Sequence, residues 1–180
     1  MAKQVTVHDK TFEISIPEEK IRETVNEMAR QIGKDLKGKN PLFLIVLNGA
    51  FVFAADLVRQ MDFDCEVSFV KLSSYAGTKT TSVVRELIGL DEVLTDRTVV
   101  IVEDIIDTGI TMASTIEKLK HLQAAEVKLA TFLFKPDSFQ KDFKIDYIGI
   151  EIPNDFIIGY GLDYDGLARN YPDIYKVVQE

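Results

Sequence analysis

Residues 98–115, TVVIVEDIIDTGITMAST, decide the fold of this chain. The first five, 98–102, are all β-branched and mostly apolar, which is typical of a strand buried on both faces. We expect this strand to stop where the carboxylates of Glu103 and Asp104 begin. From Met112 onward, apolar residues recur at helical spacing. The stretch therefore predicts a strand, a short turn and a helix.

The predicted turn has the chemistry of an anion site. The start of a helix leaves about four backbone N–H groups unpaired at the positive end of the helix dipole. Thr108 and Thr111 add hydroxyl groups, and Gly109 lets the backbone approach a ligand closely. A phosphate group fits such a site. The glycine-rich motifs of P-loop nucleotidases and of dinucleotide-binding domains are absent from the sequence.

Three carboxylates, those of Glu103, Asp104 and Asp107, crowd the same turn. Carboxylates repel phosphate, so they need another partner, either a divalent cation or hydroxyl groups that donate to them. A sugar phosphate with a free diol, bound together with Mg²⁺, supplies both. An ordinary turn in which Asp107 or Thr108 caps the helix would explain one acid but not all of them.

Residues 99–109, VVIVEDIIDTG, resemble the phosphoribosyl pyrophosphate (PRPP) signature of type I phosphoribosyltransferases, and EDIIDTG is similar to its hypoxanthine-guanine form. The resemblance implies that Glu103 and Asp104 bind the ribose diol and its Mg²⁺. It implies that Asp107 is catalytic and accepts the N7 proton of a purine. The 5′-phosphate would bind five consecutive residues: Asp107, Thr108, Gly109, Ile110 and Thr111. Many relatives have lysine at the position of Ile110, so here the N–H donors and the dipole would act alone.

A second strand, turn and helix is predicted earlier in the chain. Residues 42–47, LFLIVL, form another apolar run, and an apolar helix is expected from about residue 51 to 61. By the resemblance, backbone groups of Asn48 and Gly49 in the turn bind the pyrophosphate of PRPP. The family usually has a lysine where this chain has Asn48, which puts charge assistance from this turn in doubt. A plain connection remains the alternative.

A polar stretch follows the next predicted strand. Residues 64–72 alternate, with Val67, Phe69 and Leu72 expected to face inward. Residues 73–84 are rich in serine and threonine, which alone suggests a mobile connection. The resemblance makes this segment a lid, because the family has a Ser-Tyr pair matching Ser74 and Tyr75. A lid would keep water away from a glycosyl cation. A return strand is expected at residues 85–90.

The purine site is implied by two further matches. Lys135 follows a predicted strand at residues 127–134, where it could be a solvated charge, but the resemblance implies that it donates to the six-position oxygen. Residues 155–169, DFIIGYGLDYDGLAR, resemble the purine-binding hood of the family. By that resemblance Phe156 stacks on the base and Ile157 offers backbone groups to its two-position edge. Asp163 helps to hold Mg²⁺ on the pyrophosphate, which Arg169 also approaches.

Composition limits the function classes. The 180 residues are 46% hydrophobic and 28% charged, which suits one domain with a normal core. A formal net charge of -8 argues against nucleic acid as a partner, because duplex binding needs a basic surface. Cys65 is the only cysteine, so no internal disulfide can form. No secretory leader and no apolar run of ~18 residues is present. We therefore expect no membrane contact and a cytoplasmic location.

The predicted fold class is α/β, a mainly parallel central sheet flanked by helices as in type I phosphoribosyltransferases. We expect one domain over residues 1–180, with a core at about 17–152 and a small hood lobe formed by residues 1–16 and 153–180.

The resemblance implies a purine salvage enzyme that transfers phosphoribose from PRPP to a 6-oxopurine, giving IMP or GMP. It also implies a homodimer or homotetramer. Two alternatives remain. Another phosphoribosyltransferase would accept xanthine, adenine or a pyrimidine. A PRPP-sensing regulator of the same fold would bind RNA or DNA, which the charge disfavours.

Overall fold

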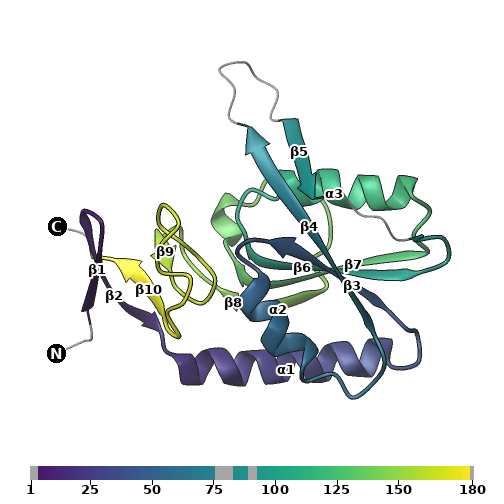
Figure 1. The fold of residues 1–180 in the computed structure, drawn as a ribbon, viewed down its shortest axis with the longest axis horizontal. Coiled ribbons are helices and arrows are strands. Elements are labelled where there is room, and N and C mark those ends of the chain that lie inside the picture. The colour runs from purple at the N-terminus through teal and green to yellow at the C-terminus, as the bar shows by residue number, and fades with distance from the viewer. Residues whose placement is uncertain (1–3, 76–82, 89–92, 179–180) are drawn as a thin grey trace.

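The fold is built from two sheets of different kinds (Figure 1). The computed structural model describes residues 4–75, 83–88 and 93–178, with only the backbone for residues 73–75 and 83–88. The larger sheet has the strand order β5-β4-β3-β6-β7-β8, and the smaller has the order β1-β2-β10-β9. Within the described residues, no helix is both long and apolar enough to span a membrane.

In the larger sheet, five neighbouring strands are parallel and one edge strand is antiparallel. Its strands are β3 (Leu42–Leu47), β4 (Glu66–Tyr75), β5 (Val83–Ile88), β6 (Thr98–Ile106), β7 (Glu126–Phe134) and β8 (Tyr147–Glu151). Helices α1 (Glu18–Leu36) and α2 (Phe51–Val58) cover one face, and α3 (Ile110–His121) covers the other (Figure 1). The predicted α/β fold is confirmed.

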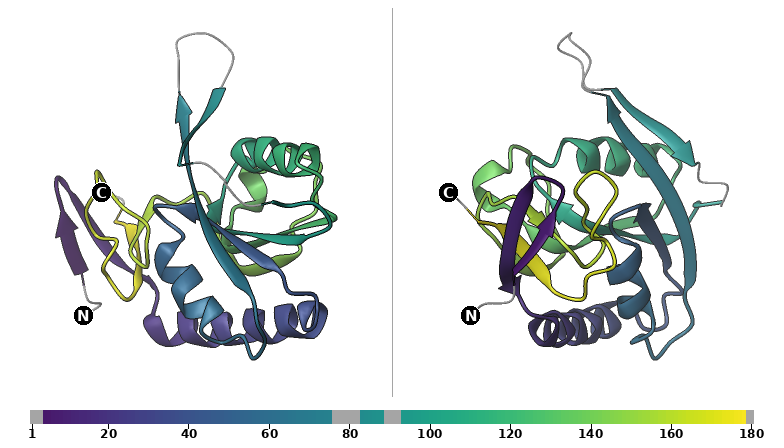
Figure 2. Two further views of the ribbon diagram at one scale, coloured as in Figure 1. Left: turned by 45° about the vertical axis from the view of Figure 1, so that its right-hand side comes forward. Right: turned by 60° about the vertical axis from the view of Figure 1, so that its left-hand side comes forward.

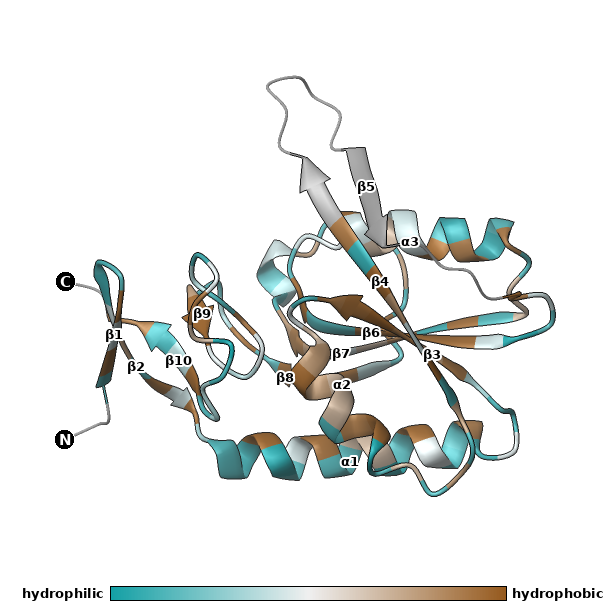
Figure 3. Ribbon diagram, in the orientation of Figure 1, coloured by the Kyte–Doolittle hydropathy of each residue, from teal (hydrophilic) through white to brown (hydrophobic). Residues whose placement is uncertain are grey.

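Helix α1 shows why these residues choose helix. Pro17 precedes its first turn, and Glu18 and Glu19 complement the positive end of the helix dipole. Its apolar side chains recur every three or four residues and are buried against the sheet, as the banding in Figure 3 shows. This buried stripe consists of Ile21, Val25, Met28, Ile32 and Leu36.

The two central strands divide their side chains between two cores. Phe43 and Ile45 of β3 join the core under α1 and α2, whereas Leu42 and Leu44 join the core under α3. Residues of β6 alternate in the same way. The predictions that residues 42–47 and 98–102 are buried on both faces are therefore confirmed, and the strands that precede the predicted turns are rigidly held.

Strand β6 is longer than predicted. It does not stop before the carboxylates but continues through Glu103 and Asp104 to Ile106. Its partner β7 is equally long and pairs Glu103 with Thr131, Ile105 with Leu133 and Ile106 with Phe134. The neighbour decides where the strand ends, so the two acids lie on regular backbone rather than in a loop.

The prediction for the faces of β4 was wrong for Val67 and Phe69, whereas Leu72 packs against the core under α3 as predicted. Val67 and Phe69 are exposed, at 43% and 47% of their surface, whereas Ser68 and Val70 are buried. Val70 packs in the core under α3, and β4 lies at the side of the parallel strands where the sheet is completed only by β5. Alternation was read correctly, but which face would be covered depends on helix placement.

The predicted lid at residues 73–84 falls mostly outside the described part. The backbone of residues 73–75 continues β4, and residue 83 begins β5, so the return strand lies two residues earlier than predicted. Residues 76–82, and the side chains of Ser74 and Tyr75, are outside the described residues. The lid therefore stays a prediction.

The smaller sheet is formed by both ends of the chain and stands beside the larger one (Figure 2). Its strands are β1 (Gln4–Val7), β2 (Lys10–Ile16), β9 (Ile157–Ile158) and β10 (Ile174–Val177). Phe12, Ile158 and Tyr175 fill its own small core. Asp173 joins it to the rest of the chain, because its Oδ1 accepts a hydrogen bond of 2.9 Å from the backbone N–H of Glu18. The predicted hood from both termini is confirmed.

Candidate active site

The turn between β6 and α3 surrounds a small hollow of about 130 Å³. Gly109 precedes the helix with a φ of 77°, the left-handed conformation that favours glycine. All five predicted phosphate ligands line this hollow, together with Glu103. They are Asp107, Thr108, Gly109, Ile110 and Thr111. The structure therefore brings the predicted phosphate ligands together at the amino end of α3, where backbone donors favour an anion.

Glu103 carries an unsatisfied acid group at the hollow. Its Oε2 is inaccessible to solvent and has no hydrogen-bond partner among the described residues. Burial, and next the charge of Asp104, raise the pKa of Glu103 well above its ordinary value. A buried polar atom without a partner is rare in a folded protein. This oxygen therefore lacks a partner of the kind that a hydroxyl group or a cation would supply.

Asp104 is partly buried where three backbone segments meet. Its Oδ1 accepts a hydrogen bond of 2.9 Å from the N–H of Ile105, and its Oδ2 lies so close to Gly49 that any side chain there would overlap it. Gly161 of the hood in turn lies against the carbonyl oxygen of Gly49. Burial raises the pKa of Asp104 to about 6, although the nearby charge of Arg169 opposes the shift.

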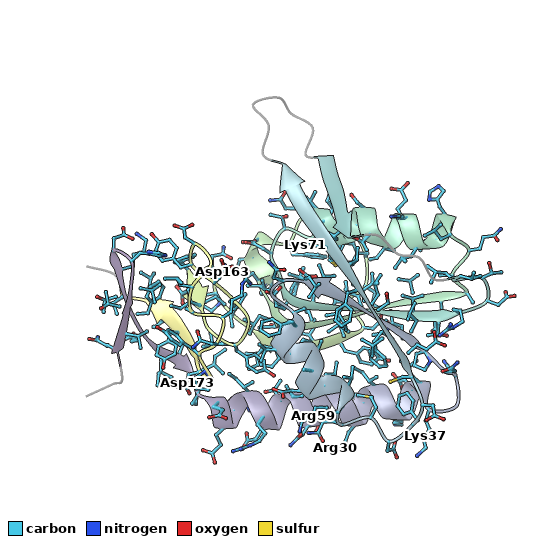
Figure 4. The ribbon with its side chains drawn as sticks, viewed as in Figure 1. Arg30, Lys37, Arg59, Lys71, Asp163 and Asp173 are labelled. Atoms are coloured by element: carbon cyan, nitrogen blue, oxygen red, sulfur yellow. The ribbon has the colours of Figure 1, made fainter. Side chains whose placement is uncertain are left out.

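An ion pair from the hood lies beside Asp104. Arg169 Nη2 is 2.6 Å from Asp163 Oδ1, and Arg169 Nη1 donates to the carbonyl oxygen of Gly161 at 2.7 Å. The charges of both side chains act on Asp104. Figure 4 shows Asp163 on the side of the hood that faces the larger sheet. The residues predicted to bind pyrophosphate and metal thus converge from β6, from the β3–α2 turn and from the hood.

Asn48, in the turn between β3 and α2, is exposed, and the Leu47–Asn48 peptide bond is cis. Within the described part of the chain, no three acidic, histidine or cysteine side chains are grouped closely enough to form a metal site by themselves. A cation at this position would need oxygen atoms from substrate or water as well, which is usual for Mg²⁺.

Lys135 and Asp107 meet at the ends of neighbouring strands. Lys135 Nζ donates to the carbonyl oxygen of Asp155 at 3.0 Å and lies 4.0 Å from Asp107 Oδ2. The Lys135 side chain is only 13% exposed, whereas that of Asp107 is 54% exposed. A buried cation therefore faces an acid that is open to a ligand.

Phe156, which follows Asp155 in the chain, presents an exposed ring. Its surface is 42% exposed, and its ring contacts those of Phe12 and Tyr164 at centroid distances of 5.9 and 5.3 Å. Ile157 is buried in β9, where it pairs with Lys176. Its side chain joins the core under α1 and α2, so only its backbone remains for a ligand.

Sequence reasoning missed two residues at this site, Tyr164 and Asp9. Tyr164 Oη donates to Asp9 Oδ1 at 2.6 Å across 155 positions of sequence. Tyr164 lies next to Asp163 in the segment that was assigned to the hood. This position was the one signal in the sequence that could have identified it. Asp9 gave none, because a charged residue in a strand turn is usually only solvated.

Comparison with known proteins shows which family this chain resembles. The phosphoribosyl transferase domain family matches residues 17–165. The hypoxanthine-guanine phosphoribosyltransferase of Lactococcus lactis is 41% identical over 166 residues, covering 91% of this chain and 90% of that protein. The enzyme of the same name from Bacillus subtilis is 36% identical, covering 89% and 90%.

Solved structures are similar over the same extent. A hypoxanthine-guanine phosphoribosyltransferase from Bacillus anthracis has a TM-score of 0.88 and 39% identity, covering 92% of this chain and 98% of that one. A hypoxanthine phosphoribosyltransferase from Staphylococcus aureus has a TM-score of 0.88 and 34% identity, covering 92% and 91%. From the matched domain, the identities and the coverage, we conclude that this chain belongs to the hypoxanthine-guanine phosphoribosyltransferase family of phosphoribosyl transferases.

Proposed function

We propose that this protein transfers the 5-phosphoribosyl group of PRPP to hypoxanthine and guanine, giving IMP or GMP and pyrophosphate. The observation that carries the proposal is the pairing of Lys135 with Asp107, 4.0 Å apart, where Asp107 lines the hollow at the amino end of α3. A ribose phosphate in that hollow would present its anomeric carbon toward an acid that can take a proton and a cation that can meet a carbonyl oxygen.

The 5′-phosphate would bind the amino end of α3 without a cationic side chain from the turn itself. Ile110 is apolar, so attraction comes from the N–H groups of the turn, from the helix dipole, and from the hydroxyls of Thr108 and Thr111. Pyrophosphate would contact the backbone of Asn48 and Gly49 and the guanidinium of Arg169.

Glu103 and Asp104 would bind the ribose diol and, with Asp163, Mg²⁺. The donor set fits a hard cation, because Glu103 Oε2 is buried without a partner and Asp104 has a raised pKa of about 6. Both acids would gain by binding a positive charge. When bound, the ion supplies positive charge to the departing pyrophosphate. We expect negligible synthesis in EDTA, restored by Mg²⁺; full activity in EDTA would remove this role.

The reaction would be a substitution at the anomeric carbon. Purine N9 forms the new bond to this carbon as its bond to the pyrophosphate oxygen breaks, through a transition state with oxocarbenium character. Asp107 would accept the N7 proton, which N9 attack makes acidic. Lys135 would donate to the six-position oxygen, where negative charge increases. No covalent intermediate with the enzyme is needed, and Phe156 would hold the purine ring by stacking.

The decisive experiment is a pyrophosphate-release assay with PRPP, Mg²⁺ and each free base in turn. Release with hypoxanthine and guanine, and its near absence with adenine and pyrimidines, is the expected result. Release with adenine or a pyrimidine alone would contradict the role of Lys135. Xanthine tests the two-position, where Ile157 would contribute backbone groups.

The same proposal includes a cytoplasmic enzyme that forms a homodimer or homotetramer. Size-exclusion chromatography with light scattering measures the assembly directly, because the chain has a mass of 20.3 kDa. A monomer at micromolar concentration would contradict this part of the proposal while leaving the transfer reaction intact.

A further inference from the structure

The backbone that carries the exposed ring of Phe156 has little support from regular secondary structure. Strand β9 has two residues, and Phe156 precedes it. Its carbonyl oxygen accepts a hydrogen bond of 2.9 Å from the N–H of Val177. A ring that is 42% exposed at the end of so short a strand needs lateral contacts to keep one orientation.

Tyr164 supplies one of these contacts. Its ring meets that of Phe156 nearly perpendicularly, at 87° and a centroid distance of 5.3 Å, and it also touches Phe12 at 6.3 Å. Perpendicular aromatic pairs at such distances attract each other beyond simple burial. The orientation of Phe156 therefore depends on where the Tyr164 ring is held.

The turn between β1 and β2 holds the Tyr164 ring from the far side. Asp9 Oδ1 accepts a hydrogen bond of 2.6 Å from Tyr164 Oη. His8 stacks on Tyr164 edge to face at 5.1 Å, and Lys10 Nζ lies 5.9 Å from the centre of the same ring. This hydrogen bond joins a carboxylate to a phenol. Such charge-assisted bonds are stronger than neutral ones.

We propose that Tyr164 is a positioning residue for the purine, acting through Phe156, and that Asp9 holds Tyr164 in place. The inference rests on the proposed function, because it requires a base to stack on Phe156. It makes the β1–β2 turn, more than 140 positions away in sequence, part of purine recognition. It predicts a defect in binding the base and none in binding PRPP.

The test compares Tyr164→Phe, Asp9→Asn and the double variant in steady-state kinetics with hypoxanthine and with PRPP. Tyr164→Phe keeps the ring and removes only the hydroxyl. We expect the KM for hypoxanthine to rise roughly fivefold in each single variant. Because both substitutions weaken the same bond, the double variant should be no worse than the more affected single variant. The kcat and the KM for PRPP should stay within about twofold of the wild type.

Tyr171→Phe is the matched control. Tyr171 also lies in the hood and contacts another aromatic ring, that of Tyr175, at 5.6 Å, and its hydroxyl has no hydrogen-bond partner among the described residues. It should leave all parameters unchanged. An unchanged KM for hypoxanthine in Tyr164→Phe, additive effects in the double variant, or equal losses for both substrates would overturn the inference. Absence of turnover in the wild-type protein would instead overturn the proposed function, and this inference with it.

Discussion

Two turns that each follow a buried parallel strand and lead into a helix have opposite designs. The turn between β6 and α3 surrounds a hollow, has Gly109 at a φ of 77°, and leaves the Asp107 side chain 54% exposed. The turn between β3 and α2 is filled instead, because Gly49 lies against Asp104 on one side and Gly161 on the other. The same strand-turn-helix unit can therefore leave a hollow that fits an anion, or it can pack tightly against an acid of the neighbouring strand.

The glycines differ for the same reason. Gly109 has a positive φ and also lies against the Phe139 ring, whereas Gly49 has no positive φ and is needed because a side chain there would overlap Asp104. If this comparison is right, substitutions in the open turn should change chemistry and PRPP binding, and substitutions in the filled turn should change stability as well.

The largest effect is expected at the exposed acid of the open turn. Asp107→Asn keeps the shape of the side chain but removes the proton acceptor, so kcat should fall about 10³-fold while the KM for PRPP changes little. Initial-rate kinetics with PRPP and hypoxanthine measure both quantities. Equal losses in kcat and in PRPP binding would assign Asp107 to binding rather than to catalysis.

Adding a single methyl group at Gly49 should disrupt the filled turn between β3 and α2. Gly49→Ala would overlap Asp104 Oδ2, and the hydrogen bond from the N–H of Ile105 to Oδ1 restrains this side chain. Overpacking of this kind costs about 2 kcal/mol of unfolding free energy, and we expect the KM for PRPP to rise as well. Urea unfolding and kinetics measure the two effects.

Gly109→Ala is the comparison in the open turn. Its added carbon would lie 2.5 Å from an edge atom of the Phe139 ring and would strain a φ of 77°. We expect Gly109→Ala to raise the KM for PRPP and to lower the free energy of unfolding by less than Gly49→Ala does. The same pattern in both variants would remove the distinction between the turns.

Substitution of Asp104 tests how much its desolvated carboxylate lowers the free energy of unfolding. In EDTA at pH 8, Asp104→Asn should stabilise the protein by about 2 kcal/mol, because it removes a buried carboxylate while its amide oxygen can still accept the hydrogen bond from Ile105. The pKa of Asp104 is about 6 in the folded state and 3.8 as the ordinary value. The ionised group is therefore unfavourable above pH 6, and its cost disappears as pH falls from 6 toward 4.

Urea unfolding at pH 8 and pH 5 measures this difference. The gain should be smaller at pH 5, and Asp107→Asn, at an exposed position, should show no such gain. A variant that is less stable than the parent at pH 8 would mean that Asp104 is held by favourable charge interactions, chiefly with Arg169.

The smallest effect is expected from adding a charge to the open turn. Ile110→Lys should lower the KM for PRPP about threefold, since exposed charge pairs contribute little. Ser114→Lys, one turn further along α3 and exposed, controls for net charge. A similar change in both variants would show that only the overall charge of the protein matters.

The sequence by itself determined the elements whose causes are local. The apolar runs at residues 42–47 and 98–102 could only be buried strands, and the start of a helix after Gly109 follows from periodicity and backbone freedom. Crowding of Glu103, Asp104 and Asp107 at that start was visible in the residue order alone. These features depend on neighbours within a few positions, so pattern and elementary chemistry predict them.

Tertiary structure decided everything that depends on a distant partner. Strand β6 extends to Ile106 because β7 pairs with it, and Val67 faces solvent because β4 turns Val70, not Val67, toward the core under α3. The same holds for the contact of Gly49 with Asp104 and for the hydrogen bond between Tyr164 and Asp9. Residues far apart in sequence meet only when sheets and helices pack, and no local pattern records which of them will meet.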